Sequence, residues 1–260
     1  MRLAASYNFF NGEEHFLDSI RSIRPYVEVI SVVWQKISNA GEPISDEARE
    51  VLNEAARRGW VDTIHLYTPN LSFERADNER VKRRIGLDLA RTAGASHFLN
   101  LDTDEIYRGD EFSEARRQIE AYGWQSTSVS SFLHVKRPIY RARDRTNCCF
   151  ITQIGSETEI GVPDFPCDTV DDTRKMTADP DTHHHFPADV VAMYHMNLIR
   201  RDLSSKLRNS SSRNTAFLGE VERVVRDWMP GDPLYFPKKG LLDIKQVPNE
   251  FGTYDPGAPC

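Results

Sequence analysis

The stretch "FLNLDTDEIY", residues 98–107, places three acidic side chains directly after a short apolar run. The run has the composition of a buried strand, and Asp102, Asp104 and Glu105 follow it. Carboxylates this close together repel one another, and burying them costs free energy unless a cation or hydrogen-bond donors compensate. We therefore expect positively charged groups at this point of the fold.

Strand-like and helix-like segments alternate through the first hundred residues. Strands are predicted at residues 2–10, 26–34, 61–67 and 97–102, and helices at residues 12–24, 45–58 and 78–93. The second helix begins at a good N-cap residue, Ser45, and ends before Gly59. Such alternation predicts a parallel sheet covered by helices, with ligands bound at the carboxyl ends of the strands. The acids after residue 101 stand at such an end.

The pattern changes after residue 110. One more helix is predicted at residues 110–123, followed by segments rich in β-forming residues that we expect to add antiparallel strands to the same sheet. Residues 229–260 are dense in proline and glycine and predict an irregular tail that wraps the domain. We expect one domain over residues 1–228, whose two halves are residues 1–109 and 110–228.

Composition limits the classes of function. The net charge of -6 predicts no general affinity for a nucleic-acid backbone. The N-terminal residues lack the apolar core of a secretory signal, and "VEVISVVW" is far too short to span a bilayer. Four cysteines, two of them adjacent (Cys148 and Cys149), form neither a disulfide framework nor a zinc-site spacing. Reduced thiols in a cytoplasmic protein are expected, with a peripheral position at the membrane left open.

The two aspartates of the D-x-D sequence suggest a divalent cation. In an extended segment, residues two apart project to the same side, so Asp102 and Asp104 would hold one object together. Hard oxygen ligands suit Mg²⁺ or Mn²⁺, which usually also hold substrate phosphates. The alternative is that an acid after a strand only caps the next helix. A calcium loop of the EF-hand type does not fit, because Ile106 and Tyr107 stand where it needs an acid or amide and a glycine.

The order of these pieces resembles a glycosyltransferase of the GT-A fold, and in particular the family 2-like group. The resemblance covers residues 1–215 and rests on "LDTDE" (101–105), Arg83-Arg84-Ile85-Gly86 in the preceding helix, "VVWQKISNAGEP" (32–43) and "YHMNLIRRDLSSKLRNSS" (194–211). Arg84 replaces the asparagine that usually follows the arginine in that group. The resemblance implies a GT-A, Rossmann-like mixed α/β sheet flanked by helices. It further implies that residues 1–109 form a nucleotide-sugar-binding half and residues 110–228 a smaller, antiparallel acceptor half.

The resemblance also implies a nucleotide-sugar donor and a divalent ion, Mn²⁺ or Mg²⁺. By resemblance, Asp104 would bind the metal directly and Asp102 would contact the ribose and the metal shell. His195 would be a third metal ligand; the alternative is a packed strand histidine beside Tyr194. UDP is the commonest donor nucleotide in the resembling group.

Further residues are implied on the donor side. Arg200 and Lys206 would clamp the diphosphate, and Arg83 would contact the ribose or a phosphate. The base would be held where the first two strands end, by the side chains Tyr7, Asn8 and Gln35. For Arg200 and Lys206, the alternative is a solvated surface charge.

An inverting enzyme of this kind uses a carboxylate as general base. The acidic loop "DTVDDTRKM" (168–176) offers Asp171 and Asp172, with Asp168 as a third choice. A retaining enzyme would need no such base. The run His183–His185 is expected in an acceptor loop or on the surface, because three consecutive side chains cannot all face one ion on regular backbone.

Two other functions stay open. A haloacid-dehalogenase-type phosphohydrolase also places D-x-D after a strand, but after its first strand. A non-catalytic sugar- or nucleotide-binding relative is the other. The hydroxyl acceptor is open as well: a glycan, a lipid-linked sugar, a protein or a modified nucleobase. Because the acids repel one another, Asp104→Ala is expected to leave stability unchanged or raised.

Overall fold

In the computed structural model, which describes residues 1–258, strands and helices alternate along the N-terminal half as predicted. The elements of this half are β1 (Leu3–Phe9), α1 (Phe16–Ile23), the short 3₁₀ helix η1 (Arg24–Tyr26), β2 (Val29–Trp34), α2 (Asp46–Arg57), β3 (Thr63–Leu66), α3 (Arg75–Thr92), β4 (His97–Asp102), the two-residue strand β5 (Glu105–Ile106) and α4 (Gly109–Tyr122).

The predicted signals at the ends of α2 and α3 operate as expected. The Ser45 hydroxyl accepts a hydrogen bond of 2.9 Å from the backbone N–H of Ala48, which caps α2. Gly59 and Gly94 follow α2 and α3 with φ angles of 67° and 70°, a left-handed conformation that glycine adopts without steric cost.

The second half adds strands to the same sheet. Its elements are β6 (Ser126–Val135), β7 (Tyr140–Gln153), the 3₁₀ helix η2 (Pro180–Thr182), β8 (His183–Phe186), β9 (Ala192–Leu198), α5 (Leu203–Arg208), α6 (Thr215–Asp227), β10 (Leu234–Phe236), β11 (Gly240–Leu242) and β12 (Lys245–Gln246). The expectation of antiparallel strands is right for β7, which is antiparallel to both β4 and β6, but β8 and β9 run parallel to β6.

The main sheet of the described chain has the strand order β3-β2-β1-β4-β7-β6-β9-β5. Strands β1 to β4 run parallel to one another, so their carboxyl ends meet at one edge. The two-residue strand β5 pairs with β9 and brings Glu105 opposite His195. This mixed α/β sheet, flanked by helices, confirms the predicted fold class.

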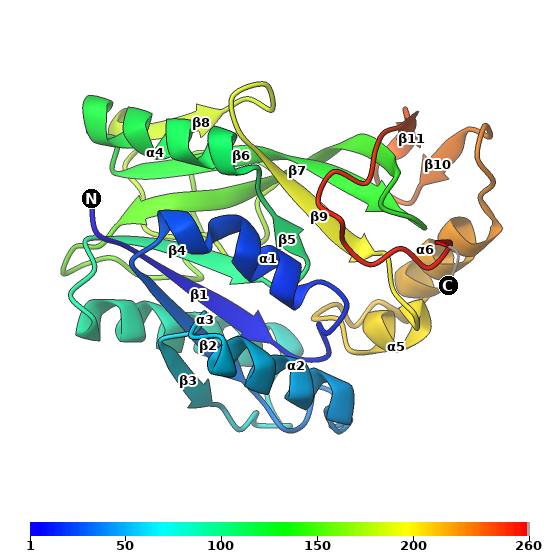
Figure 1. The fold of residues 1–260 in the computed structure, drawn as a ribbon, viewed down its shortest axis with the longest axis horizontal. Coiled ribbons are helices and arrows are strands. Elements are labelled where there is room, and N and C mark those ends of the chain that lie inside the picture. The colour runs from blue at the N-terminus through cyan, green and yellow to red at the C-terminus, as the bar shows by residue number, and fades with distance from the viewer. Residues whose placement is uncertain (259–260) are drawn as a thin grey trace.

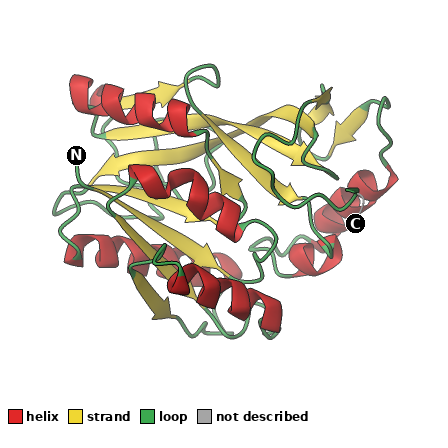
Figure 2. Cartoon of the chain, viewed as in Figure 1, coloured by secondary structure: helices red, strands yellow, loops and turns green. Residues whose placement is uncertain are grey.

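Helices cover both faces of the sheet. In Figure 1, α1, α2 and α4 lie in front of the strands and α3 lies behind β1 and β2. Side chains alternate across β1, so that Tyr7 and Phe9 enter the core with α1, α2 and α4, while Ala4 packs beside Leu87 of α3. Figure 2 shows the same layers coloured by secondary structure.

The C-terminal segment is more ordered than an irregular tail. The strands β10 and β11 form a hairpin whose side chains Leu234, Phe236 and Leu242 are buried against α6 and β7. Residues beyond β12 return across the domain, where the Thr253 hydroxyl bonds to His15 and Asp255 pairs with Arg137. Within residues 1–258, no helix is long and apolar enough to cross a membrane.

The free energy of unfolding is expected to fall as the pH drops from about 6.5 to about 4. His15 is fully buried, donates from Nε2 to the Ile199 carbonyl (2.7 Å) and accepts at Nδ1 from the Thr253 hydroxyl. His134 is buried too and donates from Nδ1 to the Pro138 carbonyl. Burial lowers the pKa of each imidazole from 6.5 to about 4. The unfolded chain therefore binds more protons between these pH values, which favours unfolding there.

Urea unfolding at pH 7, 6 and 5 measures this dependence. His15→Gln should flatten it, whereas His65→Gln, which removes an exposed histidine of β3, should not. Equal unfolding midpoints at pH 7 and pH 5 would contradict the assignment of neutral buried histidines.

Candidate active site

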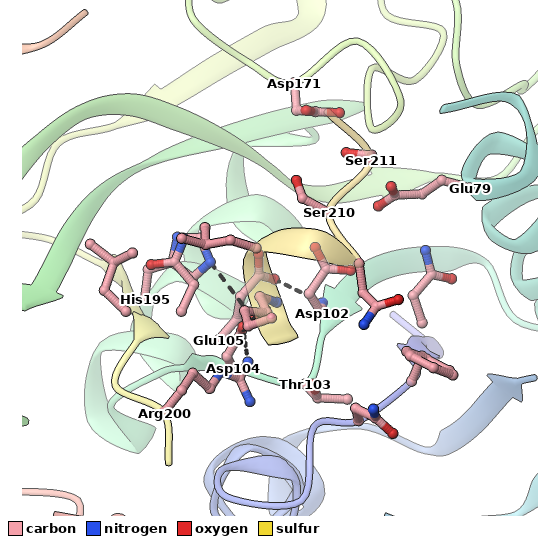
Figure 3. Close-up of a pocket in the computed structure, with 18 of the residues that line it drawn as sticks. Glu79, Asp102, Thr103, Asp104, Glu105, Asp171, His195, Arg200, Ser210 and Ser211 are labelled. Carbon is pink, nitrogen blue, oxygen red and sulfur yellow. Dashed lines mark hydrogen bonds and ion pairs between the residues drawn. The ribbon is translucent and has the colours of Figure 1, made fainter. Parts of the chain in front are cut away.

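A cavity of about 560 Å³ opens where β1, β2 and β4 end. Its wall combines residues of the first half, such as Asn8, Gln35 and Asp102, with residues of β9, α5 and α6. The location follows from the topology, because the carboxyl ends of parallel strands leave a crevice at the sheet edge. Figure 3 shows the acids in one turn, His195 and Arg200 approaching them, and Asp171 coming from a separate loop.

The three acids of the turn point to different partners. The chain leaves its extended path after Asp102, because Thr103 and Asp104 form a turn before β5. Asp102 and Asp104 therefore do not act as one extended pair, which corrects the sequence-based geometry. Asp104 and Glu105 are fully buried, whereas the side chain of Asp102 keeps 29% of its exposure and faces the cavity.

Asp104 is surrounded by cations. Its Oδ2 atom accepts hydrogen bonds from the Arg200 guanidinium and from Lys206 Nζ, the latter at 2.9 Å. Arg200 is itself buried and donates at 2.8 Å to Glu14, so that it bridges two acids. Burial would raise the pKa of Asp104, but Lys206 and Arg200 hold this pKa well below its usual value. Asp104 is therefore ionised at neutral pH.

The other two acids bind further arginines. Arg174 forms a bidentate pair with Glu105, donates at 2.8 Å to the Asn100 carbonyl and lies 3.6 Å from Asp102. Arg83 of α3 reaches both oxygens of Asp102 at 3.2 Å. The positive groups expected beside the acids are thus present within the chain itself, as four basic side chains.

His195 stands beside the one atom of Asp104 that these cations leave free. Its Nε2 lies 3.6 Å from Asp104 Oδ1, and this buried oxygen has no hydrogen-bond partner among residues 1–258. A buried oxygen without a partner is costly. The carboxylate oxygen suits Mg²⁺ or Mn²⁺, and the imidazole nitrogen, a common transition-metal ligand, favours Mn²⁺ of the two. The two atoms are close enough to be neighbouring ligands of one ion. Since no group of three or more His, Cys, Asp or Glu residues in the described chain is arranged to hold a metal, substrate oxygens and water would complete the shell.

The predicted base-binding residues separate into two groups. Asn8 and Gln35 line the cavity, and the Gln35 side chain donates to Asn39 at 3.3 Å. Tyr7 does not reach the cavity wall, because it points to the opposite face of the sheet, where its hydroxyl bonds to Ser19. The placement of Tyr7 at the base is therefore corrected.

The three aspartates of the acidic loop also differ in whether they line the cavity. Asp171 lines the cavity, and its Oδ1 accepts hydrogen bonds from the backbone N–H of Thr173 (2.8 Å) and from the Thr173 hydroxyl (2.5 Å). The Asp172 side chain is 73% exposed, pairs with Lys175 and does not line the cavity. Asp168 does not line it either. Only Asp171 of the three faces the acids across the cavity.

The histidine run forms a strand away from this cavity. His183–Phe186 make β8, which pairs with β6, and His183 and His185 bond to the hydroxyls of Ser126, Ser128 and Ser130 on the neighbouring strand. His184 points the other way and stacks on Trp124 with 3.6 Å between ring centroids. The run therefore links strands, rather than lying in the acceptor loop.

Several site residues carry no recognisable signal in the sequence. Arg174 and Glu14 belong to no motif, and their partners lie 69 and 186 residues away along the chain. Lys239 forms a partly buried pair with Asp144 in the cavity wall, again between distant segments. Lys82 sits one residue before Arg83 on the buried side of α3, and no sequence motif marks its position.

Comparisons with known proteins find only distant likeness. No protein-family model matches the chain, and no curated protein matches it either. One solved structure that resembles it is S. aureus TarS 1–349, with 12% identity over 51% of this chain and 36% of that chain and a TM-score of 0.38. Its complex with UDP-GlcNAc gives 12% identity over 52% of this chain and 35% of that chain, also with a TM-score of 0.38. Another is mannose-1-phosphate geranyltransferase from Thermus thermophilus, with 16% identity over 56% of this chain and 50% of that chain and a TM-score of 0.30. The chain spans between a third and a half of these proteins, and likeness at this level assigns no function.

Proposed function

We propose that the chain is a metal-dependent glycosyltransferase that moves a sugar from a nucleotide-diphosphate sugar to a hydroxyl acceptor. The observation that carries the proposal is the environment of Asp104. This ionised carboxylate lies in the turn after β4 and lines the cavity, with Arg200 and Lys206 on one oxygen and His195 beside the other. Such a group of cations and metal-ligand atoms suits a diphosphate.

The basic side chains fit the charge that develops during transfer. When the bond between the sugar and the diphosphate breaks, negative charge accumulates on the departing phosphate oxygens. Cations that the protein holds close to that position stabilise the transition state electrostatically. Lys206 keeps 37% of its side-chain exposure and would turn from Asp104 to the donor, while buried Arg200 would remain with Asp104 and Glu14.

The residues around Asp104 also fit a divalent ion. Asp104 Oδ1 and His195 Nε2 would hold Mn²⁺ or Mg²⁺, and Asp102 would contact the ribose and the shell of the ion. When bound, such an ion supplies electrostatic stabilisation of the leaving diphosphate. On the acceptor side, Asp171 would take the proton from the attacking hydroxyl, with Thr173 holding its carboxylate in place.

The topology favours this function over a haloacid-dehalogenase-type phosphohydrolase. The D-x-D sequence follows the fourth strand of the chain, whereas the phosphohydrolase motif is expected after the first. For the donor we propose a UDP-sugar. The free thiols Cys148, Cys149 and Cys167 favour a reducing compartment, the cytoplasm.

Nucleoside diphosphate binding is expected to require a divalent ion. Calorimetry with UDP and with GDP should show binding in Mn²⁺ and at least about tenfold weaker binding in EDTA, because the ion offsets phosphate charge next to Asp104. Release of nucleotide from a panel of nucleotide sugars, with and without acceptor alcohols, tests the activity itself. Equal affinity in Mn²⁺ and EDTA would contradict the metal site, and binding without release from any donor would favour a non-catalytic relative.

A further inference from the structure

Lys82 is a buried cation in the cavity wall, and the proposed contacts to the metal ion, the diphosphate and the acceptor do not involve it. It belongs to α3, is 4% exposed and lines the cavity. Its Nζ makes one hydrogen bond, a long one of 3.4 Å to the Phe9 carbonyl, and no ion pair with any residue in the described chain. Removing an ammonium group from water without pairing it is expensive. A structural role alone does not explain why this position carries a lysine.

The acids nearest to Lys82 are already engaged. Glu79 and Asp102 both pair with Arg83, the next residue of α3. Burial is the dominant influence on the Lys82 amine and lowers its pKa from 10.5 to about 8, although Glu79 and Asp102 act in the opposite direction. The amine is therefore mostly protonated at neutral pH and still lacks an acceptor with good geometry.

Two neighbouring amide side chains are equally incomplete. Gln35 is 2% exposed and its Oε1 atom has no hydrogen-bond partner within residues 1–258. Neither Oδ1 nor Nδ2 of Asn8 finds a partner in that part of the chain. Both residues end neighbouring parallel strands, β1 and β2, and line the same cavity as Lys82. Buried polar atoms are nearly always paired in folded proteins, so this group indicates a polar ligand.

We propose that Lys82 selects donor nucleotides whose base carries a carbonyl oxygen next to a ring N–H, as uracil and guanine do. This inference rests on the proposed function. The Lys82 ammonium would donate to the base carbonyl, and Gln35 Oε1 or Asn8 Oδ1 would accept from the adjacent N–H. Adenine offers an amino group and an unprotonated ring nitrogen at that edge, and cytosine has no ring N–H beside its carbonyl. Either base would leave buried groups unpaired, which a site of this kind penalises.

The affinities of UDP, GDP, ADP and CDP, measured by calorimetry with Mn²⁺, test the proposal. The native chain should bind UDP or GDP at least about tenfold more tightly than ADP, because a hydrogen bond to a charged group is worth about that factor or more. In Lys82→Met, the preferred nucleotide should weaken by about 10- to 100-fold while ADP changes little, so that the preference disappears. Methionine fills the same space without a buried charge, and a thermal melt checks the fold; Lys82→Gln serves if the methionine variant does not fold.

Lys36→Met is the matched control, because Lys36 follows Gln35 but is exposed and does not line the cavity. It removes the same charge and should leave all four affinities unchanged. An equal loss for UDP, GDP and ADP in Lys82→Met would overturn the proposal and assign Lys82 to the ribose or diphosphate. Unchanged affinities in that variant would overturn it as well. If the native chain binds none of the four nucleotides, the proposed function fails together with this inference.

Discussion

Asp104→Asn is expected to reduce the rate of sugar transfer by about 10³-fold or more. The reason is that Asp104 contacts both the basic side chains and the proposed position of the metal ion. One oxygen holds Arg200 and Lys206, and the other faces His195. The asparagine keeps the size of the side chain but loses the charge that orders these cations. The initial rate of nucleotide release from the best donor, with Mn²⁺ and acceptor present, measures the loss.

The same substitution is expected to lower the free energy of unfolding by about 3 kcal/mol, since removing one member of a buried ion pair leaves the other charge uncompensated. Arg200 would then have only Glu14 as its acidic partner. This reverses the sequence-based expectation that removing an acid would preserve or raise stability. That expectation considered only the repulsion among the three acids, and the cations that surround them outweigh it.

Glu14→Gln separates stability from catalysis. It removes the second acid of Arg200 and should lower stability to a similar degree, yet Asp104, Lys206 and His195 keep their contacts. Transfer by Glu14→Gln should remain clearly measurable at a temperature where both variants are folded. If both variants lose activity equally, Asp104 acts only by holding Arg200 in place, and its direct role at the diphosphate is wrong.

The position of the acids was predictable from local sequence, but their pairing with basic side chains was not, because Arg83, Arg200 and Lys206 were expected to contact the donor. Strand-helix alternation and the signals at Ser45 and Gly59 specify a parallel sheet and place Asp102 at its carboxyl edge. Arg174 and Arg200 meet the acids from 69 and 96 residues away. Contacts of this length depend on how the second half folds back onto the sheet, and no local pattern encodes them.

The prediction that Tyr7 binds the base conflicts with the geometry of a β-strand. Successive residues of a strand point to opposite faces, so Tyr7 and Asn8 cannot both face the same ligand. The structure follows this rule, with Tyr7 in the core and Asn8 in the cavity wall. By contrast, the parallel pairing of β9 with β6 was not predictable, because it depends on the long connection between residues 154 and 182.

Glu105 links the three acids to the segment between residues 154 and 182. Its buried pair with Arg174 anchors the loop, and the Arg174 backbone N–H donates to the Asp171 carbonyl at 2.9 Å. Glu105, the third acid after β4, therefore serves to hold this loop and not to bind a metal. The arrangement fixes Asp171 relative to Asp102 and Asp104, as a base acting on an acceptor beside the donor would require.

Asp171→Asn is expected to lower kcat by about 10²- to 10⁴-fold, the usual contribution of a general base. The asparagine keeps the size of the side chain and an oxygen that accepts from Thr173, so the loop should stay in place. Affinity for the nucleoside diphosphate in Mn²⁺ should change little, because the basic groups at Asp104 lie on the donor side. Steady-state rates and calorimetry on the same preparation measure the two effects.

Asp172→Asn is the matched control, since it makes the same chemical change one residue away on an exposed side chain outside the cavity. Its kcat should stay within about twofold of the native value, because an exposed ion pair contributes little. If Asp171→Asn also keeps a near-native kcat, Asp171 is not the base. NMR of the product anomer then decides the mechanism: inversion requires a different base, and retention means that the enzyme uses no base of this kind.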